Sequence, residues 1–257
     1  MSEKKLMKGN EAIAEAAIRG GCRYFFGYPI TPQNEIPEYM SWRIREVGGD
    51  FVQAESEVAA INMVYGAAGA GARAMTSSSS PGISLKQEGI SYLACAELPC
   101  VIVNMVRSGP GLGGILASQC DYFQTVKGGG HGDYKLLTYA PSTVQEAVDI
   151  LYYAFDKADE YRTPVCILGD GLLGQIMEPV TFPEMKEMPD PSTKSWAVTG
   201  THHGKDKTLA SSIYIDPNLG EAQNNHLVEK FERIAQKETQ CEEFMCDDAE
   251  IILTGYG

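Results

Sequence analysis

Three polar side chains of this chain each lie next to an apolar stretch and could carry chemistry together: Thr31, Glu57 and Arg107. Arg107 ends the continuous apolar run Val101–Val106, and an arginine at the end of a buried strand can anchor a carboxylate or a phosphate. Taken alone, Arg107 could equally form a surface ion pair. Glu57 taken alone could be an acid in a first helical turn, where the helix dipole favours a negative charge. A functional role for these residues therefore depends on whether the fold brings their side chains together at one site.

The segment Tyr28-Pro29-Ile30-Thr31-Pro32 closes the apolar run Tyr24–Gly27, which predicts a buried strand. Two prolines within four residues prevent that strand from continuing. Thr31 directly before Pro32 predicts a helix N-cap followed by proline in the first turn. Such a turn presents N–H groups and a hydroxyl at the carboxyl end of a sheet, where open α/β sheets bind ligands. The segment therefore predicts one wall of a site.

Helical and strand patterns alternate along the first 175 residues. Apolar spacing predicts helices at 10–19 (with Asn10 as N-cap), 36–47, 57–70, 84–97 and 142–161, and strands at 24–27, 51–53, 73–77, 101–106, 136–139 and 165–168. This strict alternation predicts an α/β fold, a parallel sheet with helices on both faces. The carboxyl ends of parallel strands share one edge, so Thr31, Glu57 and Arg107 are expected to meet in one crevice.

The pattern changes after residue 178. Four prolines interrupt the next stretch (Pro179, Pro183, Pro189 and Pro191), and a charged helix is predicted at 218–236. The run Ala249–Thr254 has the pattern of a buried strand, followed by a glycine turn. We therefore predict an α/β domain over 1–178, a linker with a charged helix over 179–248, and the first strand of a truncated second α/β domain over 249–257. A final strand added to the first sheet is the alternative.

The composition of the chain argues against several classes of function and location. The chain has 257 residues and a formal net charge of −13, which argues against nucleic acid or an anionic membrane as partner. No apolar run is long enough to span a bilayer, and the first residues lack a secretory pattern, so a cytoplasmic protein is expected. The seven cysteines are expected to be reduced. They form no closely spaced set for an iron–sulfur cluster, which would have to come from another chain.

Several motifs together resemble one known family. They are the segment Tyr28–Pro32, the glutamate of Ser56-Glu57-Val58-Ala59-Ala60, the strand ending in Arg107, and the runs Ser108–Gly113, Asp121–Gln124 and Lys127–Tyr134. The chain is similar to the α-type subunits of 2-oxoacid:ferredoxin oxidoreductases, and most similar to the branched-chain type that acts on 3-methyl-2-oxobutanoate (2-oxoisovalerate). The resemblance is strong from Lys8 to about Val180 and weak from there to Gly257.

The resemblance implies a thiamine diphosphate enzyme in which this chain supplies the pyrimidine-binding domain. Glu57 then matches the carboxylate that bonds the far ring nitrogen of the aminopyrimidine and favours its imino tautomer, which takes the proton of the reactive carbon. Thr31 and Arg107 match positions that contact the 2-oxo acid, Arg107 through the substrate carboxylate. The residues implied to line the cofactor site are Tyr28, Pro29, Ile30, Glu57 and, in the loop 77–81, Ser79.

The resemblance also implies partner chains. Gly169-Asp170-Gly171 with the later Asn224-Asn225 looks like the magnesium–diphosphate motif of thiamine enzymes, but the spacing is too long, so a strand-end turn is expected. The cofactor would then be shared across an interface with a β-type subunit that holds Mg²⁺ and an iron–sulfur cluster. A ferredoxin-like subunit would carry further clusters, ferredoxin would take the electrons, and coenzyme A would accept the acyl group.

Other interpretations stay open at this point. A related enzyme could use 2-oxoglutarate or pyruvate, because side-chain selectivity depends on the shape of the pocket. A non-catalytic α/β module could dock a partner without binding thiamine. A self-contained thiamine decarboxylase would need the diphosphate motif that is missing. His131 is either a loop residue or a group placed near the substrate.

Overall fold

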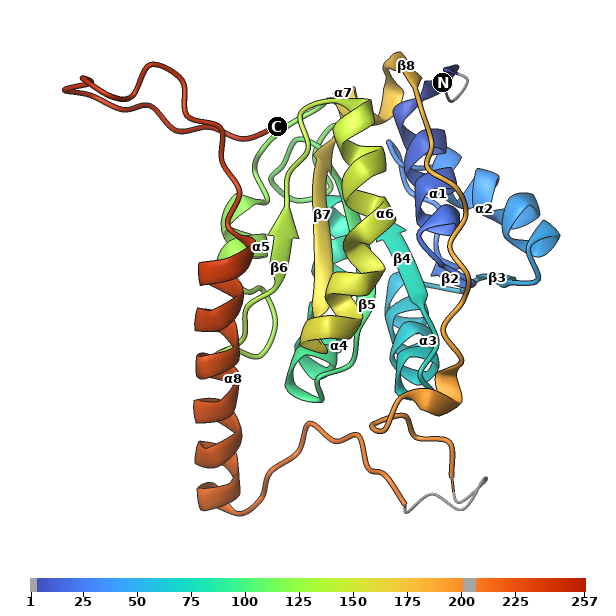
Figure 1. The fold of residues 1–257 in the computed structure, drawn as a ribbon, viewed down its shortest axis with the longest axis vertical. Helices are drawn as coiled ribbons and strands as arrows, with labels where there is room; N and C mark the ends of the chain where they lie inside the picture. The colour runs from blue at the N-terminus through green and yellow to red at the C-terminus, as the bar shows by residue number, and fades with distance from the viewer. Residues whose placement is uncertain (1–3, 201–206) are drawn as a thin grey trace.

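A computed structural model describes residues 4–200 and 207–257. The elements in chain order are β1 Lys5–Lys8, α1 Gly9–Arg19, β2 Tyr24–Gly27, α2 Glu35–Glu46, β3 Asp50–Gln53, α3 Glu57–Gly69, β4 Ala74–Ser78, α4 Ser80–Cys95, β5 Cys100–Val106, α5 Tyr122–Lys127, β6 Leu137–Tyr139, α6 Val144–Tyr161, β7 Pro164–Asp170, α7 Gly171–Gln175, β8 Met177–Val180, a short 3₁₀ turn at Pro191–Thr193 and α8 Pro217–Glu238. The large sheet has six strands in the order β3-β2-β4-β5-β7-β6, and every pairing in it is parallel. Helices α1 and α6 pack on one face and α3 and α4 on the other (Figure 1). The predicted α/β fold is confirmed.

The apolar runs became the buried centre of this sheet. All seven residues of β5 are buried, as a strand covered by helices on both faces requires. The amphipathic helix α6 buries the stripe predicted from its spacing, including Val148, Leu151 and Phe155. Burying each side chain of this kind stabilises the folded state by about 1.5–3 kcal/mol. The buried core therefore holds the strands of the sheet in place, and with them the positions at which the strands end.

The first helix differs from its prediction. It begins at Gly9, and Asn10 lies inside it, buried, rather than at its N-cap. The reason is an antiparallel pairing of β1 with β8 that the sequence did not predict. Since β1 ends at Lys8, the helix α1 begins at the next residue. Thr31 is likewise no N-cap, because α2 begins later, at Glu35. Thr31 instead precedes a cis peptide bond to Pro32 and is exposed.

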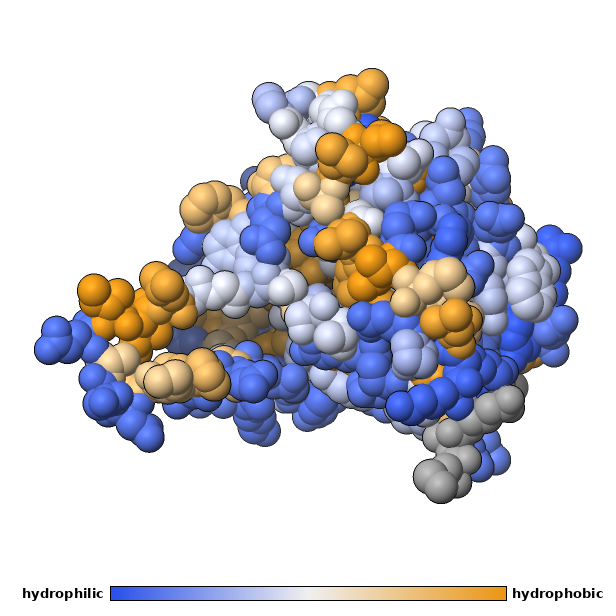
Figure 2. Space-filling model, turned by 90° about the horizontal axis from the view of Figure 1, so that it is seen from above, coloured by the Kyte–Doolittle hydropathy of each residue, from blue (hydrophilic) through white to orange (hydrophobic). Residues whose placement is uncertain are grey.

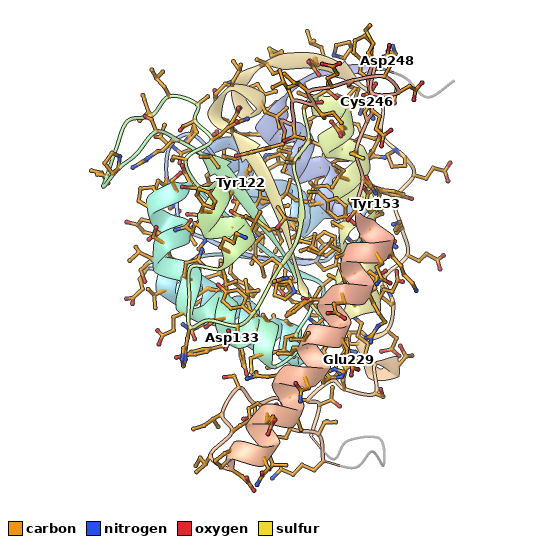
Figure 3. The ribbon with its side chains drawn as sticks, turned by 90° about the vertical axis from the view of Figure 1, so that its left-hand side faces the viewer. Tyr122, Asp133, Tyr153, Glu229, Cys246 and Asp248 are labelled. Carbon is orange, nitrogen blue, oxygen red and sulfur yellow. The ribbon has the colours of Figure 1, made fainter. Side chains whose placement is uncertain are left out.

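The C-terminal part also differs in one respect. Helix α8 forms close to its predicted bounds and lies along the side of the domain, with Tyr153 beside its C-terminal end (Figure 3). The predicted strand at Ala249–Thr254 is wrong, because residues 249–257 form no strand and Leu253 is 93% exposed. An extended apolar segment becomes a strand only when another strand pairs its backbone groups. The division into three parts stays a prediction, and residues 1–3 and 201–206 of its ranges lie outside the described residues.

Glu238, the last residue of helix α8, bonds this helix to the rest of the domain. Its carboxylate accepts hydrogen bonds from the hydroxyls of Tyr161 and Tyr139 and from the Lys157 ammonium. Burial alone would raise the pKa of Glu238, but the bonds from Tyr161 and Lys157 outweigh it and hold that pKa below its ordinary value. A carboxylate with a lowered pKa stabilises the fold above its unfolded pKa, and this stability is lost as the pH falls through the folded value.

We expect Glu238→Gln to lower the free energy of unfolding by about 1–3 kcal/mol at pH 7, because the charge-assisted bonds are lost. The variant should also lose less stability than the parent chain between pH 5 and pH 3, because its side chain cannot be protonated there. Urea unfolding at several pH values measures both effects. An identical pH dependence in the two proteins would contradict the assignment.

The cysteines are free thiols. Burial raises the pKa of the Cys22 and Cys166 thiols to about 12, so these two are packing residues rather than nucleophiles. Within residues 4–200 and 207–257, no three His, Cys, Asp or Glu side chains gather as metal ligands. Across the same residues, every helix is too short or too polar to cross a bilayer.

Candidate active site at the carboxyl ends of the strands

The carboxyl ends of the parallel strands form one edge of the domain. This edge is the upper end in Figure 1, where β7 passes into α7. Figure 2 looks onto it and shows apolar side chains set among polar ones, with a hollow beside the projecting C-terminal segment. The candidate residues all come from the turns that leave this edge, as the parallel topology requires.

Arg107 and Thr31 are in direct contact. The Arg107 guanidinium donates one hydrogen bond from Nη1 to the Thr31 carbonyl oxygen (2.9 Å) and one from Nη2 to the Leu112 carbonyl oxygen (2.7 Å). The side chain is buried, and its Nε has no hydrogen-bond partner among the described residues. Arg107 is therefore not the surface ion pair that its type alone allowed. It is a buried cation that two backbone oxygens hold in place, while its Nε and the second hydrogens of its two Nη atoms make no hydrogen bond among the described residues.

Hydrogen bonds from other elements hold the backbone of the turn that contains Thr31. The Pro32 carbonyl oxygen accepts hydrogen bonds from the side-chain amides of Asn10 (2.7 Å) and Gln175 (3.1 Å). The buried Gln33 donates from its side chain to the Tyr28 carbonyl oxygen and accepts a hydrogen bond from the Ser77 hydroxyl. Tyr28 and Ile30 are half-buried, and Pro29 is exposed. These contacts fix the backbone of the turn, so its exposed residues can form a rigid wall.

Glu57 is the first residue of α3 and is 7% exposed. The Ser56 hydroxyl caps the helix by accepting a hydrogen bond from the Ala59 N–H, so the helix start does not need the Glu57 carboxylate. Among the described residues no hydrogen-bond donor reaches that carboxylate. A buried carboxylate without a donor is costly unless a ligand or a nearby charge compensates it. The simple helix-start interpretation therefore does not account for Glu57.

Gly82 in the first turn of α4 brings two polar side chains, those of Glu57 and Ser78, together. A Cβ atom there would lie 2.8 Å from Glu57 Oε1 and 2.1 Å from the Ser78 hydroxyl oxygen, so both atoms pack against the bare Cα. The hydroxyls of Ser78 and Ser79 are buried and have no hydrogen-bond partner in the described part of the chain. A carboxylate and two unpaired hydroxyls thus lie around the start of one helix.

The same helix start joins Glu57 to Arg107. The Ser80 hydroxyl accepts a hydrogen bond from the Arg107 N–H (3.0 Å) and donates one to the Arg107 carbonyl oxygen (3.2 Å). The Ser80 N–H donates in turn to the side chain of Asn104, which is buried in β5. The sequence pattern predicted the helix start four residues later, included Ser80 only within the loop 77–81, and gave no role to Asn104. The serine run 77–80 directly before Pro81 was the available signal, because it places a proline in a first helical turn.

We expect Gly82→Ala to lower the free energy of unfolding by about 1–3 kcal/mol, because the added methyl group overlaps Ser78 and Glu57. Gly66→Ala is the matched control, since Gly66 lies inside α3 and a Cβ there meets nothing within 4 Å. That control should stabilise the chain by up to about 1 kcal/mol through helix propensity. Denaturant unfolding of both variants measures the difference, and equal effects would contradict the close packing at Gly82.

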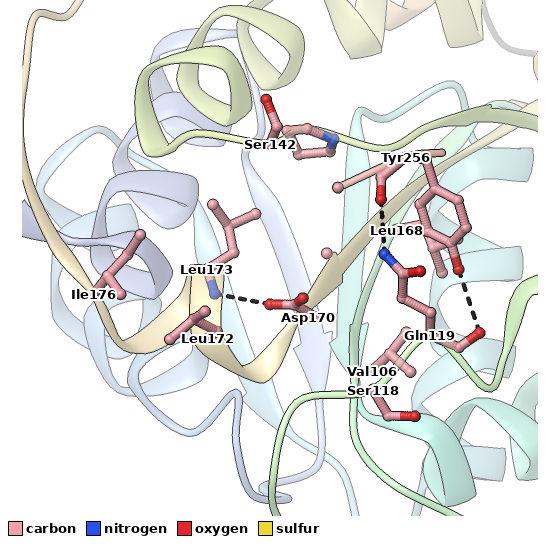
Figure 4. A pocket seen from close by; sticks show the side chains of 13 residues that line it. Val106, Ser118, Gln119, Ser142, Leu168, Asp170, Leu172, Leu173, Ile176 and Tyr256 are labelled. Atoms are coloured by element: carbon pink, nitrogen blue, oxygen red, sulfur yellow. Dashed lines mark hydrogen bonds between the residues drawn. The ribbon is translucent and has the colours of Figure 1, made fainter. Parts of the chain in front are cut away.

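A cavity of about 280 Å³ lies between the ends of β5 and β7 (Figure 4), and its lining does not include Thr31, Glu57 or Arg107. Asp170 lies on its wall, and its carboxylate accepts a hydrogen bond from the Leu173 N–H, which caps the five-residue helix α7. The motif Gly169-Asp170-Gly171 thus ends a strand and starts a short helix, as predicted. Tyr256 closes the cavity on the far side through two hydrogen bonds with Gln119.

His131 is exposed in the loop that follows α5. The loop is tied to α4 by the Tyr134 hydroxyl, which accepts from the N–H groups of Gly129 and Gly130 and donates to Gln87. These bonds involve the backbone on either side of His131 rather than its ring. The loop interpretation of His131 therefore accounts for its position.

Comparisons with known proteins identify the family of this chain. Residues 15–243 match the family described as pyruvate flavodoxin/ferredoxin oxidoreductase, thiamine diphosphate-binding. The ketoisovalerate oxidoreductase subunit VorB of Methanothermobacter thermautotrophicus is 54% identical over 98% of this chain and 71% of its own length. The 2-oxoglutarate synthase subunit KorA of the same organism is 46% identical over 72% of this chain and 49% of its own length.

A solved structure extends the comparison to the fold. The 2-oxoglutarate:ferredoxin oxidoreductase from Magnetococcus marinus, with 2-oxoglutarate, coenzyme A and succinyl-CoA bound, superimposes with a TM-score of 0.81 at 27% identity. The match covers 93% of this chain and 46% of that one, so this chain spans about half of the larger protein. With a family match over most of its length and a relative 54% identical, the chain belongs to the thiamine diphosphate-binding family of pyruvate flavodoxin/ferredoxin oxidoreductases.

Proposed function

We propose that this chain is the pyrimidine-binding subunit of an enzyme that oxidatively decarboxylates a branched-chain 2-oxo acid to its acyl-coenzyme A. One observation carries the proposal: the buried Glu57 and the buried Arg107 flank the same helix start, Glu57 without a hydrogen-bond donor and Arg107 with an unused one. A carboxylate for a ring nitrogen and a guanidinium for a substrate carboxylate are the two groups that this chemistry needs from one side.

The residues fit the aminopyrimidine of thiamine diphosphate. When bound, this cofactor supplies an acidic ring carbon that becomes a nucleophile toward the 2-oxo group. Glu57 would hold the ring nitrogen by sharing a proton with it, which favours the imino tautomer. The unpaired hydroxyls of Ser78 and Ser79 and the wall formed by Tyr28, Pro29 and Ile30 would position the ring and keep water away. Gly82 leaves the room that a side chain would fill.

Arg107 and Thr31 would hold the 2-oxo acid. The second N–H groups of the Arg107 Nη atoms can donate to the substrate carboxylate, while the two bonds to backbone oxygens keep the guanidinium from turning. Thr31 is exposed on the same turn, so its hydroxyl is available to the carboxylate or to the oxo group. A cation fixed in advance costs no rearrangement when the substrate binds, and this lowers the barrier as well as the Kd.

The proposal requires other subunits. Asp170, the one acid of the diphosphate-like motif, is already used as a local helix cap. A β-type subunit would therefore hold the diphosphate and Mg²⁺ together with an iron–sulfur cluster, and a ferredoxin-like subunit would pass electrons to ferredoxin in the cytoplasm. The exposed side chains of Leu112, Ile115 and Leu116, directly after Arg107, support a contact with another chain at this edge.

The branched-chain substrate rests on the relatives. The VorB subunit matches nearly the whole chain at 54% identity, whereas the KorA subunit matches 72% of it at 46%. The test is to assemble this chain with its partner subunits and to measure ferredoxin reduction dependent on thiamine diphosphate and coenzyme A. We expect 3-methyl-2-oxobutanoate to give a higher kcat/KM than pyruvate or 2-oxoglutarate. No thiamine-dependent turnover with any of the three would overturn the enzyme assignment.

A 2-oxoglutarate enzyme is the second candidate, because the KorA relatives and the Magnetococcus structure point to that substrate class. The same assay separates the two. A preference for 2-oxoglutarate would keep the roles of Glu57 and Arg107 and change only the substrate.

A further inference from the structure

Lys86 is a fully buried lysine directly behind the candidate site. It lies on α4, one helical turn after Gly82, so the two residues share a face of the helix. Its ammonium donates hydrogen bonds to the Thr76 hydroxyl (2.8 Å) and to the Ser77 carbonyl oxygen (3.0 Å), both on β4. An ammonium has three N–H donors, so one is left for another group. Stability does not explain such a residue, since a buried cation is costly.

Glu57 is the charge that faces this ammonium. Gly82 lies against the Glu57 carboxylate and one turn from Lys86, so the acid and the base lie on the same side of α4. Strand β4 contributes only the neutral groups of Thr76 and Ser77 to the surroundings of the ammonium. Within the described chain, Glu57 is the one ionised group whose field acts appreciably on Lys86.

We propose that Lys86 is a positioning residue for Glu57: the charge of its buried ammonium attracts the Glu57 carboxylate and holds it in the orientation that meets the ring nitrogen of an aminopyrimidine. This inference rests on the proposed function and assigns one further residue to it. Without the ammonium, the carboxylate would lose the opposite charge that attracts it from α4 and would be freer to turn away from the ring nitrogen. A hydrogen bond to the ring nitrogen would then be less well aligned and therefore weaker.

The charge of Lys86 itself depends on pH. Burial lowers its pKa from 10.5 to about 7, and the Glu57 carboxylate opposes that shift. The ammonium is therefore charged below about pH 7 and neutral above it. Its effect on Glu57 should be present at pH 6 and should fade toward pH 9 in the unaltered protein, without any substitution.

The experiment compares two cofactors on the assembled complex. The probes are thiamine diphosphate and its 1′-deaza analogue, in which the ring nitrogen facing Glu57 is replaced by CH. The measured quantity is the ratio of their Kd values, obtained by titrating the cofactor-free complex and following protein fluorescence. The unaltered complex should prefer the natural cofactor, and Lys86→Met should reduce that preference by about tenfold at pH 6. Lys86→Arg, which keeps the charge, should restore most of it.

Lys230→Met is the matched control. Lys230 is also buried, but it bonds to Glu97 and to the Arg162 carbonyl oxygen, beside helix α8. Its loss should lower the stability of the chain and leave the ratio unchanged. In a Glu57→Gln background, Lys86→Met should also leave the ratio unchanged, since glutamine cannot ionise.

The outcomes separate the two proposals. If the unaltered complex shows no preference between the two cofactors, the role of Glu57 and with it the proposed function are wrong. If that preference exists but survives in Lys86→Met, only the role of Lys86 is overturned. Should Lys86→Met not assemble, the pH series on the unaltered complex decides: a preference that stays constant from pH 6 to pH 9 overturns the inference.

Discussion

Replacing Glu57 with glutamine is expected to lower kcat of the assembled enzyme by about a hundredfold or more, or roughly 2.7 kcal/mol of barrier. Glutamine keeps the size of the side chain and its ability to form hydrogen bonds, but it cannot take up the proton that the ring nitrogen must share. The carboxylate lies at the cluster with Gly82 and Ser78, and the helix does not need it as a cap. The loss should therefore appear in the chemistry and not in folding.

Steady-state turnover with saturating cofactor and 2-oxo acid measures this loss. Glu55→Gln is the control, because Glu55 is an exposed carboxylate two residues earlier in the chain. It should change kcat less than twofold. Turnover of Glu57→Gln within tenfold of the parent enzyme would remove the assigned role.

The second large effect is expected at Arg107. Substituting lysine keeps the positive charge but cannot reproduce a planar guanidinium that bonds two backbone oxygens and still offers a third donor. We expect kcat/KM for the 2-oxo acid to fall by about ten- to a hundredfold, in line with about 1.5–3 kcal/mol for a hydrogen bond to a charged group. Most of the change should appear in KM, since the carboxylate is bound in both the ground state and the transition state.

Arg73→Lys is the matched control for this prediction. Arg73 is an equally buried arginine, but it precedes β4 at the opposite end of the sheet and pairs with Asp156 and Asp159. Its replacement should lower the stability of the chain and leave KM for the 2-oxo acid unchanged. A similar KM for both variants would show that Arg107 supports the turn of Thr31 without contacting the substrate.

The contacts around Thr31 show how the fold prepares the site. Pro32 is held by Asn10 from α1 and by Gln175 from α7, so elements far apart in the sequence fix one turn. On the other side, Ser80 ties the start of α4 to Arg107. The turn of Thr31 and the backbone of Arg107 are thus each held by groups from other elements. This arrangement favours a preformed site over one that forms only on binding.

The sequence by itself determined the α/β class, the succession of the main strands along the chain and the edge at which the polar side chains meet. Those properties follow from the spacing of apolar residues and from the rule that the carboxyl ends of parallel strands lie at one edge of the sheet. Both can therefore be read from the amino-acid sequence. The position of Arg107 at the end of a buried strand and its nearness to Thr31 could be predicted for this reason. The helix-start position of Glu57 was also predicted and is confirmed.

Only the tertiary structure decided what surrounds these groups. The pairing of β1 with β8 moved Asn10 from the expected cap into the interior, and the segment 249–257 did not become a strand because no strand among the described residues pairs with it. Lys86 shows the physical reason most clearly. A lysine on a helix looks like a solvent-exposed charge, and its burial behind Glu57 arises because α4 packs against β4 at the height of Gly82. Such contacts depend on distances between elements, which local patterns do not encode.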